Sequence, residues 1–309
     1  MKAWIDGELV DEENGLVSAM SHTLHYGTGV FEGIRAYGVN DDTLVFRLMD
    51  HLERLERSAR AMHFDIKFSL EQLRDAVIDV LRHNDLQDAY IRPLIYVGAG
   101  SLALNFHASA NPLSTMIAAR KWDRYFEADG LSGISVVTGI GRRLTSQTEL
   151  HQAKVAGAYA NSYVATMAAQ KAGADEAILV DENDCISEAS AANIFHVQDG
   201  VLYTPTCRTA LAGITRDTII LIARQRGLKV CEVELTADDL YGAAEIFLTG
   251  TACEVVPVTA VDGKSIGEGA GAGTVGPLTQ ELHTAYQRTV RSRHSFSSNT
   301  WIGKQTIAA

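Results

Sequence analysis

Hydrophobic positions recur at two spacings along the chain, and these spacings predict which segments form helices and which form strands. Apolar residues three and four positions apart predict a helix after Asp50, its expected N-cap, with Arg54 on the solvated face. Ser69 and Gln72 form the pattern of a capping box at the start of a second helix. Further helices are predicted with an apolar stripe over residues 163–168, from Gly213, from Thr236 and from Pro277.

Strands are predicted where apolar and β-branched residues run between turn residues. The opening segment predicts a hairpin across Asp6 and Gly7. The apolar run 89–97 predicts a strand in which Pro93 indicates a sheet edge or a bulge. From Glu176 to Thr204, strands and short turns follow one another without a helical pattern between them. This meander argues against a doubly wound parallel sheet and favours an α/β fold of the α+β type.

The polar segment from Arg120 to Gly130 ends in a turn and is the expected domain boundary. A chain of 309 residues is long enough for two domains with separate cores. We therefore predict a small N-terminal domain over residues 1–120, an interdomain loop over 121–130 and a larger C-terminal domain over 131–309.

Composition and charge narrow the class of partner. The net charge of −11 disfavours nucleic acid and anionic membrane surfaces, although it allows small anionic ligands in a local basic pocket. No apolar run reaches membrane-spanning length, and we expect no signal peptide. The four cysteines are far apart, which favours a reducing, cytoplasmic location. His22 and His25 lack a third ligand nearby, so we expect packing or hydrogen-bonding histidines and no metal site.

Lys154 is the first candidate for chemistry. It lies among small and apolar residues with no acidic neighbour in sequence, and Tyr159 follows five positions later. Burial would disfavour its ammonium form and lower its pKa, which would suit a lysine that forms a Schiff base. The alternative is a lysine on a solvated loop, as most lysines are.

Two turns and one carboxylate complete the candidate chemistry. Gly213, Ile214 and Thr215 open a predicted helix, whose first N–H groups and dipole can bind an anion. The turn from Thr249 to Ala252 offers hydroxyls and amides to an anion. Glu188 lies on a predicted strand among small residues, as expected of a carboxylate that holds one specific partner. Pyridoxal 5'-phosphate would use the lysine, the carboxylate and both turns.

The chain resembles the branched-chain amino-acid aminotransferases of the class IV family, which are fold-type IV pyridoxal-phosphate enzymes. The resemblance covers nearly the whole chain and rests on several motifs in combination. These are Ser21–Gly27, Val30–Arg35, Tyr90–Pro93, Ala153-Lys154 with Tyr159, Ile186–Glu188 with Asn193, Leu211–Asp217 and Thr249–Ala252.

The resemblance implies roles for the residues that would bind the cofactor. Lys154 would form the Schiff base and move protons, and Glu188 would pair with the protonated ring nitrogen. Tyr159 would hydrogen-bond the phenolic oxygen. The phosphate would be bound by Arg54, which contradicts the solvated position that its spacing predicts. The other cofactor-binding residues implied are Asn193, Ile214, Thr215 and Thr251.

The resemblance also implies a substrate site for amino acids and 2-oxo acids. The amides of Thr251 and Ala252 would hold the α-carboxylate, and Leu104 would reach in from a second subunit. Arg92 is expected to bind the distal carboxylate of glutamate, with Arg35 as the second candidate. Tyr90, Ile91 and Arg92 distinguish this branch from D-amino-acid and amine transaminases. The remaining wall of the pocket would consist of Tyr26, Phe31, Gly33, Trp122 and Tyr125.

The implied reaction is amino transfer between branched-chain L-amino acids and 2-oxoglutarate, as the last step of branched-chain amino-acid biosynthesis, in a homodimer or a larger homo-oligomer. A pyridoxal-phosphate lyase on the same fold is one alternative, and a cofactor-binding protein without turnover is another. The chain departs from the family pattern after Glu188, where Ala189-Ser-Ala-Ala192 replaces a segment that usually carries a second glutamate.

Overall fold

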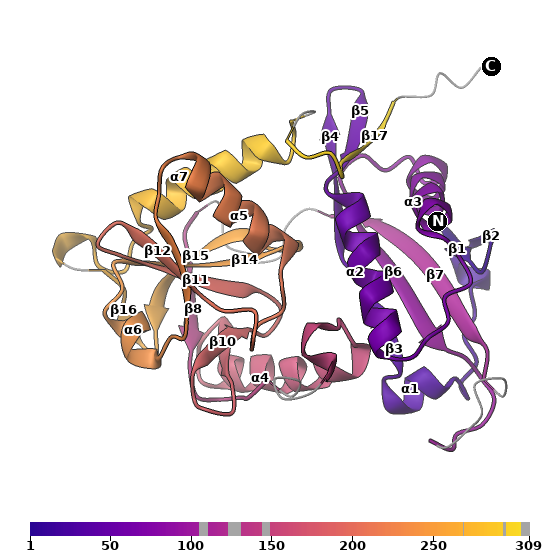
Figure 1. The fold of residues 1–309 in the computed structure, drawn as a ribbon, viewed down its shortest axis with the longest axis horizontal. Helices are drawn as coiled ribbons and strands as arrows, with labels where there is room; N and C mark the ends of the chain where they lie inside the picture. Colours follow the sequence, from indigo (N-terminus) through magenta and orange to yellow (C-terminus); the bar gives the residue numbers. More distant parts are fainter. Residues whose placement is uncertain (105–110, 123–130, 144–148, 268, 293–294, 304–309) are drawn as a thin grey trace. The chain divides into compact units, whose positions relative to one another are not determined.

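The computed structural model describes residues 1–104, 111–122, 131–143, 149–267, 269–292 and 295–303 (Figure 1). The chain divides into two compact units. The first comprises Met1–Asp123, Ala153–Gly157 and Val290–Ala309, and the second comprises Arg124–Gln152 and Ala158–Thr289. The short segment that carries Lys154 therefore belongs to the first unit, although the predicted domain 131–309 includes it. The domain bounds themselves stay a prediction.

An eight-stranded sheet, built largely from the indigo and magenta strands of Figure 1, forms the framework of the first unit. Its strand order is β17-β5-β4-β6-β7-β1-β2, with β3 also paired to β6, and its pairs are antiparallel. The predicted hairpin across Asp6 and Gly7 is confirmed, and both residues have positive φ. The strands are β1 (Lys2–Ile5), β2 (Glu8–Asp11), β3 (Gly29–Phe31), β4 (Ile34–Val39), β5 (Asp42–Val45), β6 (Ala89–Val97), β7 (Leu113–Lys121) and β17 (Thr300–Ile302).

Pro93 lies inside the sheet, so of the two predicted settings, a sheet edge or a bulge, the sheet edge is wrong. Its strand, β6, pairs with β7 on one side and with β3 and β4 on the other. Proline is tolerated because the adjacent chain leaves the ladder at Glu32 and Gly33, which separate β3 from β4. The N–H of Glu32 still donates to the Pro93 carbonyl at 2.9 Å.

Two long helices pack on this sheet: α2 (Leu48–Ala61) and α3 (Leu70–His83). The capping box of Ser69 and Gln72 at the start of α3 is confirmed. Asp50 is not the N-cap of α2, because the helix begins earlier, after Arg47 in the left-handed conformation. Asp50 lies in the first turn and forms an ion pair with Arg47. Among the described residues of this unit, the remaining helices are η1 (Glu12–Asn14) and α1 (His22–Tyr26).

A nine-stranded mixed sheet forms the second unit, in the order β10-β9-β8-β15-β14-β11-β12-β13, with β16 paired to β15. The antiparallel pairs β9–β10 and β11–β12 confirm the predicted meander only in part, because β10 and β11 lie apart in the strand order. Strand β8 runs parallel to β9 and β15. The strands are β8 (Ile134–Val137), β9 (Glu176–Val180), β10 (Ile186–Ala189), β11 (Asn193–Gln198), β12 (Val201–Pro205), β13 (Val230–Val233), β14 (Glu245–Gly250), β15 (Glu254–Val261) and β16 (Lys264–Ser265).

The predicted helices of this unit are present, but the apolar stripe of α4 (Tyr159–Lys171) was predicted wrongly. Tyr163 and Val164 are 66% and 64% exposed, whereas Ala165 and Ala169 are buried. The small alanines let the helix lie close to β9, so they form its inner face. The other helices are η3 (Glu149–Gln152), η4 (Ala156–Ala158, at the unit boundary), α5 (Ile214–Gln225), α6 (Ala237–Tyr241), η5 (Gly269–Gly271) and α7 (Pro277–Thr289).

No helix among the described residues is long and apolar enough to cross a membrane. Within the same residues, no three or more His, Cys, Asp or Glu side chains are grouped so that they could hold a metal ion. His22 and His25 hydrogen-bond instead to the Thr28 hydroxyl at 2.8 Å and the Ala19 carbonyl at 2.9 Å.

Candidate active site

Lys154 lies in a short segment that pairs with β3 in the first unit. The N–H of Phe31 donates to the Lys154 carbonyl at 3.1 Å, and Val30 and Val155 form an antiparallel bridge. The N–H of Gly157 donates to the Gly27 carbonyl at 3.0 Å. Gly27 has φ +66°, and a side chain there would lie 2.5 Å from the Gly157 Cα, so only glycine fits this close approach. The backbone of Lys154 is thus fixed to a buried strand.

The side chain of Lys154 lies against an aromatic ring that a second cation shares. Its Nζ lies 4.8 Å from the centroid of the Phe31 ring, and the guanidinium of Arg92 lies 4.6 Å from the same centroid. Cations are attracted to ring faces at these distances. Lys154, the predicted catalytic lysine, and Arg92, which is predicted to bind the distal carboxylate of glutamate, therefore contact the same phenylalanine ring.

Tyr90 connects Arg92 to two further predicted pocket residues. Arg92 Nη2 donates to the Tyr90 hydroxyl at 3.0 Å, and the Tyr90 ring stacks on Trp122 at 4.7 Å between centroids. A Cβ on Gly33 would lie 2.0 Å from the Tyr90 hydroxyl, so glycine is required for this ring position. The first unit therefore brings together six of the predicted site residues: Phe31, Gly33, Tyr90, Arg92, Trp122 and Lys154.

A buried polar face of α2 supports both this cluster and Arg54. His51, Arg54 and Ser58 are spaced by three and four residues and are at most 5% exposed. Ser58 Oγ accepts a hydrogen bond from the Lys154 N–H at 2.9 Å. Arg54 forms an ion pair with Glu32 at 2.6 Å, so the solvated position predicted from spacing is wrong. A buried arginine was missed because its partner lies 22 residues upstream.

Four other predicted pocket residues lie apart from these contacts or outside the described residues. Tyr26 is 46% exposed, with its ring 4.7 Å from that of His22. Arg35 is buried and lies over Tyr37 at 5.0 Å, and Leu104 is 74% exposed. Tyr125 lies outside the residues that the structure describes.

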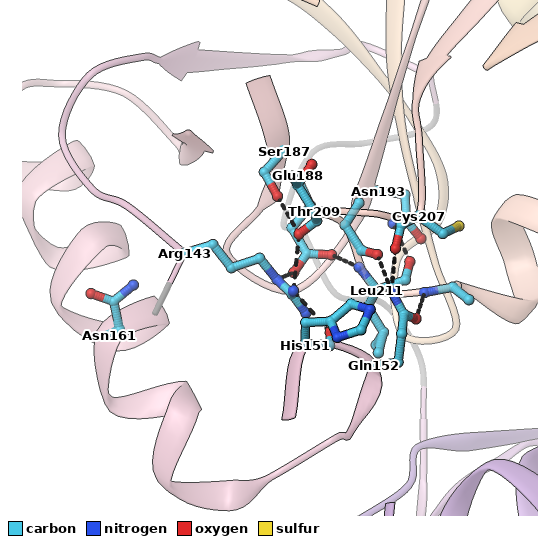
Figure 2. Close-up of polar contacts among 12 residues, drawn as sticks. Arg143, His151, Gln152, Asn161, Ser187, Glu188, Asn193, Cys207, Thr209 and Leu211 are labelled. Carbon is cyan, nitrogen blue, oxygen red and sulfur yellow. Dashed lines mark hydrogen bonds and ion pairs between the residues drawn. The ribbon is translucent and has the colours of Figure 1, made fainter. Parts of the chain in front are cut away.

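Glu188 is the centre of the second unit's candidate site (Figure 2). Its carboxylate forms an ion pair with Arg143 through Nε and accepts the Leu211 N–H at 2.9 Å. Arg143 Nη1 donates to the carbonyls of His151 and Thr209, both at 2.9 Å. The side chains of Glu188 and Arg143 are 15% and 9% exposed, so water screens this pair only weakly. Arg143 therefore fixes the position of the carboxylate.

Asn193 links the two predicted anion-binding turns. Its Nδ2 donates to the Leu211 carbonyl at 2.9 Å, two residues before the N-cap of α5, while its backbone pairs with Thr249 at the end of β14. A Cβ on Gly213 would lie 1.9 Å from Asn193 Oδ1, which explains glycine at this N-cap. Glu188 and Asn193 thus bind the N–H and the carbonyl of one residue, Leu211.

Gln152 fixes the same turn from another side (Figure 2). Its Nε2 donates to the carbonyls of Cys207 and Ala210, and its Oε1 accepts the Ala212 N–H at 2.9 Å. Since Gln152 lies two positions before Lys154, the chain is held immediately upstream of the lysine.

The first turn of α4, which carries Tyr159, is connected to this network through Asn161. Asn161 Nδ2 donates to the Arg142 carbonyl at 2.6 Å, one residue before Arg143. Tyr159 itself is half-buried at the start of the helix.

Thr251 and Ala252 form a half-buried turn that joins β14 to β15, and Ile214 and Thr215 are buried at the start of α5. Cys253 follows the first turn, and burial raises the pKa of its thiol to about 12. The neutral thiol adds no negative charge beside a turn expected to bind anions.

Each unit has groups of a kind that pyridoxal phosphate requires. The first has an amine for its aldehyde and a guanidinium for its phosphate, and the second has a fixed carboxylate for its ring nitrogen and a glycine-capped helix start for its phosphate. The sequence motifs identify the amine and the carboxylate but not Arg143 and Gln152. Arg142 and Arg143 are adjacent and alike in sequence, so no local pattern separates the exposed one from the buried one.

The chain belongs to the class IV aminotransferase family, which matches residues 29–261. It is similar to the branched-chain-amino-acid aminotransferase of Pseudomonas aeruginosa, with 42% identity over 92% of this chain and 91% of the relative. The enzyme of the same name from Escherichia coli strain K12 is 41% identical over 92% of this chain and 91% of the relative.

Solved structures agree with this membership. The T.th. branched-chain amino acid aminotransferase complexed with N-(5'-phosphopyridoxyl)-L-glutamate superposes with a TM-score of 0.90 and 40% identity, covering 97% of both chains. The Escherichia coli enzyme superposes with a TM-score of 0.91 and 39% identity, covering 96% of this chain and 98% of the other. The predicted two-domain, fold-type IV class is confirmed.

Proposed function

We propose that this chain is a pyridoxal-phosphate-dependent transaminase that moves the amino group of leucine, isoleucine or valine to 2-oxoglutarate. The observation that carries the proposal is the group of Lys154 and Arg92 on one phenylalanine ring, Phe31. An apolar, aromatic surface suits a branched side chain, and a cation at its margin suits the second carboxylate of glutamate. The relatives' names support the same reaction.

Pyridoxal phosphate, when bound, supplies an aldehyde for the lysine and a ring that withdraws electrons from the substrate Cα. Lys154 would hold the aldehyde carbon and then carry the proton between the substrate Cα and C4' of the cofactor. Phe31 and Ser58 support this role because they fix the position of the lysine.

Glu188 would hold the proton on the ring nitrogen, since its carboxylate is fixed by Arg143 and the Leu211 N–H. Tyr159 would donate to the phenolic oxygen. Arg54 would bind the phosphate, together with N–H groups and hydroxyls at Ile214, Thr215 and Thr251, and Asn193 would act through the turn that it positions.

The substrate α-carboxylate would be bound by the amides of Thr251 and Ala252, and Arg92 would bind the distal carboxylate of glutamate and 2-oxoglutarate. Tyr90 supports the position of Arg92 because its hydroxyl accepts from the guanidinium. The other proposed pocket residues are Tyr26, Phe31, Gly33, Arg35, Leu104, Trp122 and Tyr125.

A titration of the purified, cofactor-loaded protein tests this proposal. L-leucine should convert the absorption band of the bound cofactor to that of its amino form, and 2-oxoglutarate should restore the first band. A lyase would consume leucine without this return, and a protein without turnover would show neither change. Either result would contradict the proposal.

We also propose a cytoplasmic homodimer, as a minimum assembly, that acts in the last step of branched-chain amino-acid biosynthesis. Large apolar side chains of the first unit are exposed, including Leu16 at 87%, Leu24 at 64% and Leu104 at 74%. Such side chains favour association with a second copy. The four cysteines are free thiols, which suits a reducing compartment. Light scattering after size-exclusion chromatography and cell fractionation test the two statements.

A further inference from the structure

Glu32 is a buried carboxylate whose oxygens are surrounded by donors. It lies where the chain passes from β3 to β4, and its side chain is 0% exposed. Its Oε1 accepts from Arg54 Nε at 2.6 Å, and its Oε2 accepts from Arg54 Nη2 at 2.9 Å. The same Oε2 contacts His51 Nδ1 at 2.8 Å and the Gly33 N–H at 3.3 Å. An acidic residue between two buried strands is therefore held by four contacts.

The contact with Arg54 is bidentate, and this geometry fixes the plane of the guanidinium. The Nε–Nη2 edge of Arg54 faces Glu32, so Glu32 sets the orientation of the whole group. Arg54 lies one helical turn before Ser58, whose hydroxyl holds the backbone of Lys154. The direction of Arg54 is thus set relative to Lys154 through one rigid helix.

We propose that Glu32 is a positioning residue that aims Arg54 at the phosphate of the cofactor, with His51 holding the second side of the carboxylate. The inference rests on the proposed function, in which Arg54 binds that phosphate. Neither Glu32 nor His51 touches the substrate or the cofactor in this account. They act through Arg54.

Electrostatics is consistent with this role. Burial by itself raises the pKa of Glu32, but the charge of Arg54 and the hydrogen bonds from Arg54 and His51 outweigh burial and hold the pKa far below its usual range. Burial lowers the pKa of His51, against the opposing charge of Glu32, so the imidazole is neutral and donates its Nδ1–H at neutral pH. The cluster therefore combines one anion, one cation and one neutral donor.

A purely structural ion pair is the competing explanation, and the two predict different ligand affinities. If Glu32 aims Arg54, its loss weakens ligands that carry the phosphate and spares those that lack it. If the pair only stabilises the fold, both kinds of ligand respond equally. Pyridoxal 5'-phosphate and pyridoxal differ by that phosphate alone, and both can react with Lys154.

The test is a titration of the apoprotein with each ligand, followed by cofactor absorbance and protein fluorescence. Glu32→Gln should raise the Kd for pyridoxal 5'-phosphate by roughly 10- to 100-fold, the range seen when an outer contact of a ligand-binding group is removed. The Kd for pyridoxal should change by less than about twofold, within ordinary additivity error. Glu56→Gln on the outer face of α2, where Glu56 meets exposed Arg60 at 3.6 Å, is the matched control and should change neither.

Two further variants keep the outcomes distinct. Arg54→Gln should abolish the preference for the phosphorylated ligand, and if it does not, the proposed role of Arg54 fails regardless of Glu32. The positioning role of Glu32 is overturned in either of two cases, provided that Arg54→Gln loses the preference for pyridoxal 5'-phosphate over pyridoxal. In the first, folded Glu32→Gln keeps that preference. In the second, it binds both ligands more weakly by the same factor. Should Glu32→Gln unfold as apoprotein, Glu32→Asp keeps the charge but shortens the reach by one methylene, and the same criteria apply to it.

Discussion

The aromatic cluster around Phe31 in the first unit and the network around Glu188 in the second hold their candidate groups by different means. In the first, Lys154 and Arg92 lie against the Phe31 ring, and Tyr90 stacks on Trp122, so side-chain packing positions the groups. In the second, Glu188 is held by Arg143 and a backbone N–H, and Arg143 is held by two carbonyls. A packed aromatic wall can admit different side chains, whereas a charged network has one satisfied arrangement.

The two kinds of support suit two different tasks, which are accepting different substrates and holding one carboxylate in place. In the proposed function, the first unit has the surface that accepts both an apolar and an acidic side chain, together with the lysine that moves protons. The second unit has the carboxylate that is proposed to stay in one place and one protonation state. Substitutions at Arg92 and its aromatic neighbours should therefore change which substrates react, and substitutions around Glu188 should affect all substrates alike.

Lys154→Ala should have the largest effect. Turnover should fall by more than about 10³-fold, because general acid–base catalysis alone contributes roughly 10²- to 10⁴-fold and the variant also loses covalent attachment. Circular dichroism should remain that of the wild type. After borohydride reduction and mass spectrometry, only the wild type should retain the cofactor, bound at Lys154. A reduced adduct in the variant would show that another amine carries the chemistry.

Arg92→Met should separate the two substrate classes, since methionine keeps the stem and removes the charge. Desolvating an unpaired distal carboxylate should lower kcat/KM for glutamate and 2-oxoglutarate by about 2–4 kcal/mol, while leucine changes by less than about 1 kcal/mol. Single-turnover half-reactions measure both values. Equal losses would make Arg92 structural, and Arg35→Met would then be the next variant to measure.

Arg143→Gln should lower kcat for leucine and glutamate by the same factor, roughly 10- to 100-fold, as expected when an outer contact of a functional group is lost. The neighbouring Arg142→Gln is the control, because Arg142 is 54% exposed and pairs with exposed Asp184. Its kcat should stay within about twofold of wild type. A loss confined to one substrate in Arg143→Gln would contradict the division of tasks.

Two buried carboxylates should give opposite pH dependence. Burial raises the pKa of Glu176 in the second unit, although hydrogen bonds from Ala177 and Ser190 oppose the change. Its stabilising contribution is present below the unfolded value near 4.5 and is lost as pH rises through the folded pKa. Glu32 has a lowered pKa, so its contribution is present above about 4.5 and is lost as pH falls towards the folded pKa.

Urea unfolding between pH 4 and 7 should therefore show Glu176→Gln gaining stability relative to wild type as pH rises. Glu32→Gln should lose stability relative to wild type over the same rise. The carboxylate is already ionised in folded wild type at pH 4, whereas in the unfolded chain it still binds protons there, and this protonation, which favours unfolding, ends as pH rises. Parallel curves for the two variants would contradict the opposite environments assigned to the two residues.

Ala192→Glu should have the smallest effect, a slowing of cofactor release by a few-fold at most. A carboxylate there could add hydrogen bonds to a turn that the Ala189 N–H and the Ala192 carbonyl already close at 2.7 Å. The exposed neighbour Ala191→Glu is the control. Dialysis of the loaded proteins measures release, and equal or faster loss from Ala192→Glu would count against the hypothesis.

The sequence predicted elements that local rules determine. The hairpin at Asp6-Gly7, the capping box at Ser69 and the start of α5 at Gly213 depend on residues within a few positions of one another. The fold class and the aminotransferase family were also predicted correctly, because motifs specific in combination carry the resemblance.

Local patterns failed where a partner is distant in sequence. Arg54 is buried because Glu32 lies beside it, and Pro93 fits an interior strand because the chain opposite leaves the ladder. Arg143 differs from Arg142 only through contacts with Glu188, His151 and Thr209. An acidic residue within the apolar run around Glu32 was nevertheless a usable signal, since buried carboxylates require partners.

The transfer of labelled nitrogen from leucine to 2-oxoglutarate is the most direct test of the proposed reaction. The purified, cofactor-loaded protein is incubated with ¹⁵N-leucine and unlabelled 2-oxoglutarate, and the products are analysed by mass spectrometry. We expect the wild type to produce ¹⁵N-glutamate and the 2-oxo acid of leucine in equal amounts. The variant Lys154→Ala should produce neither. Release of ¹⁵N-ammonia without labelled glutamate, or labelled glutamate formed by Lys154→Ala, would contradict this expectation.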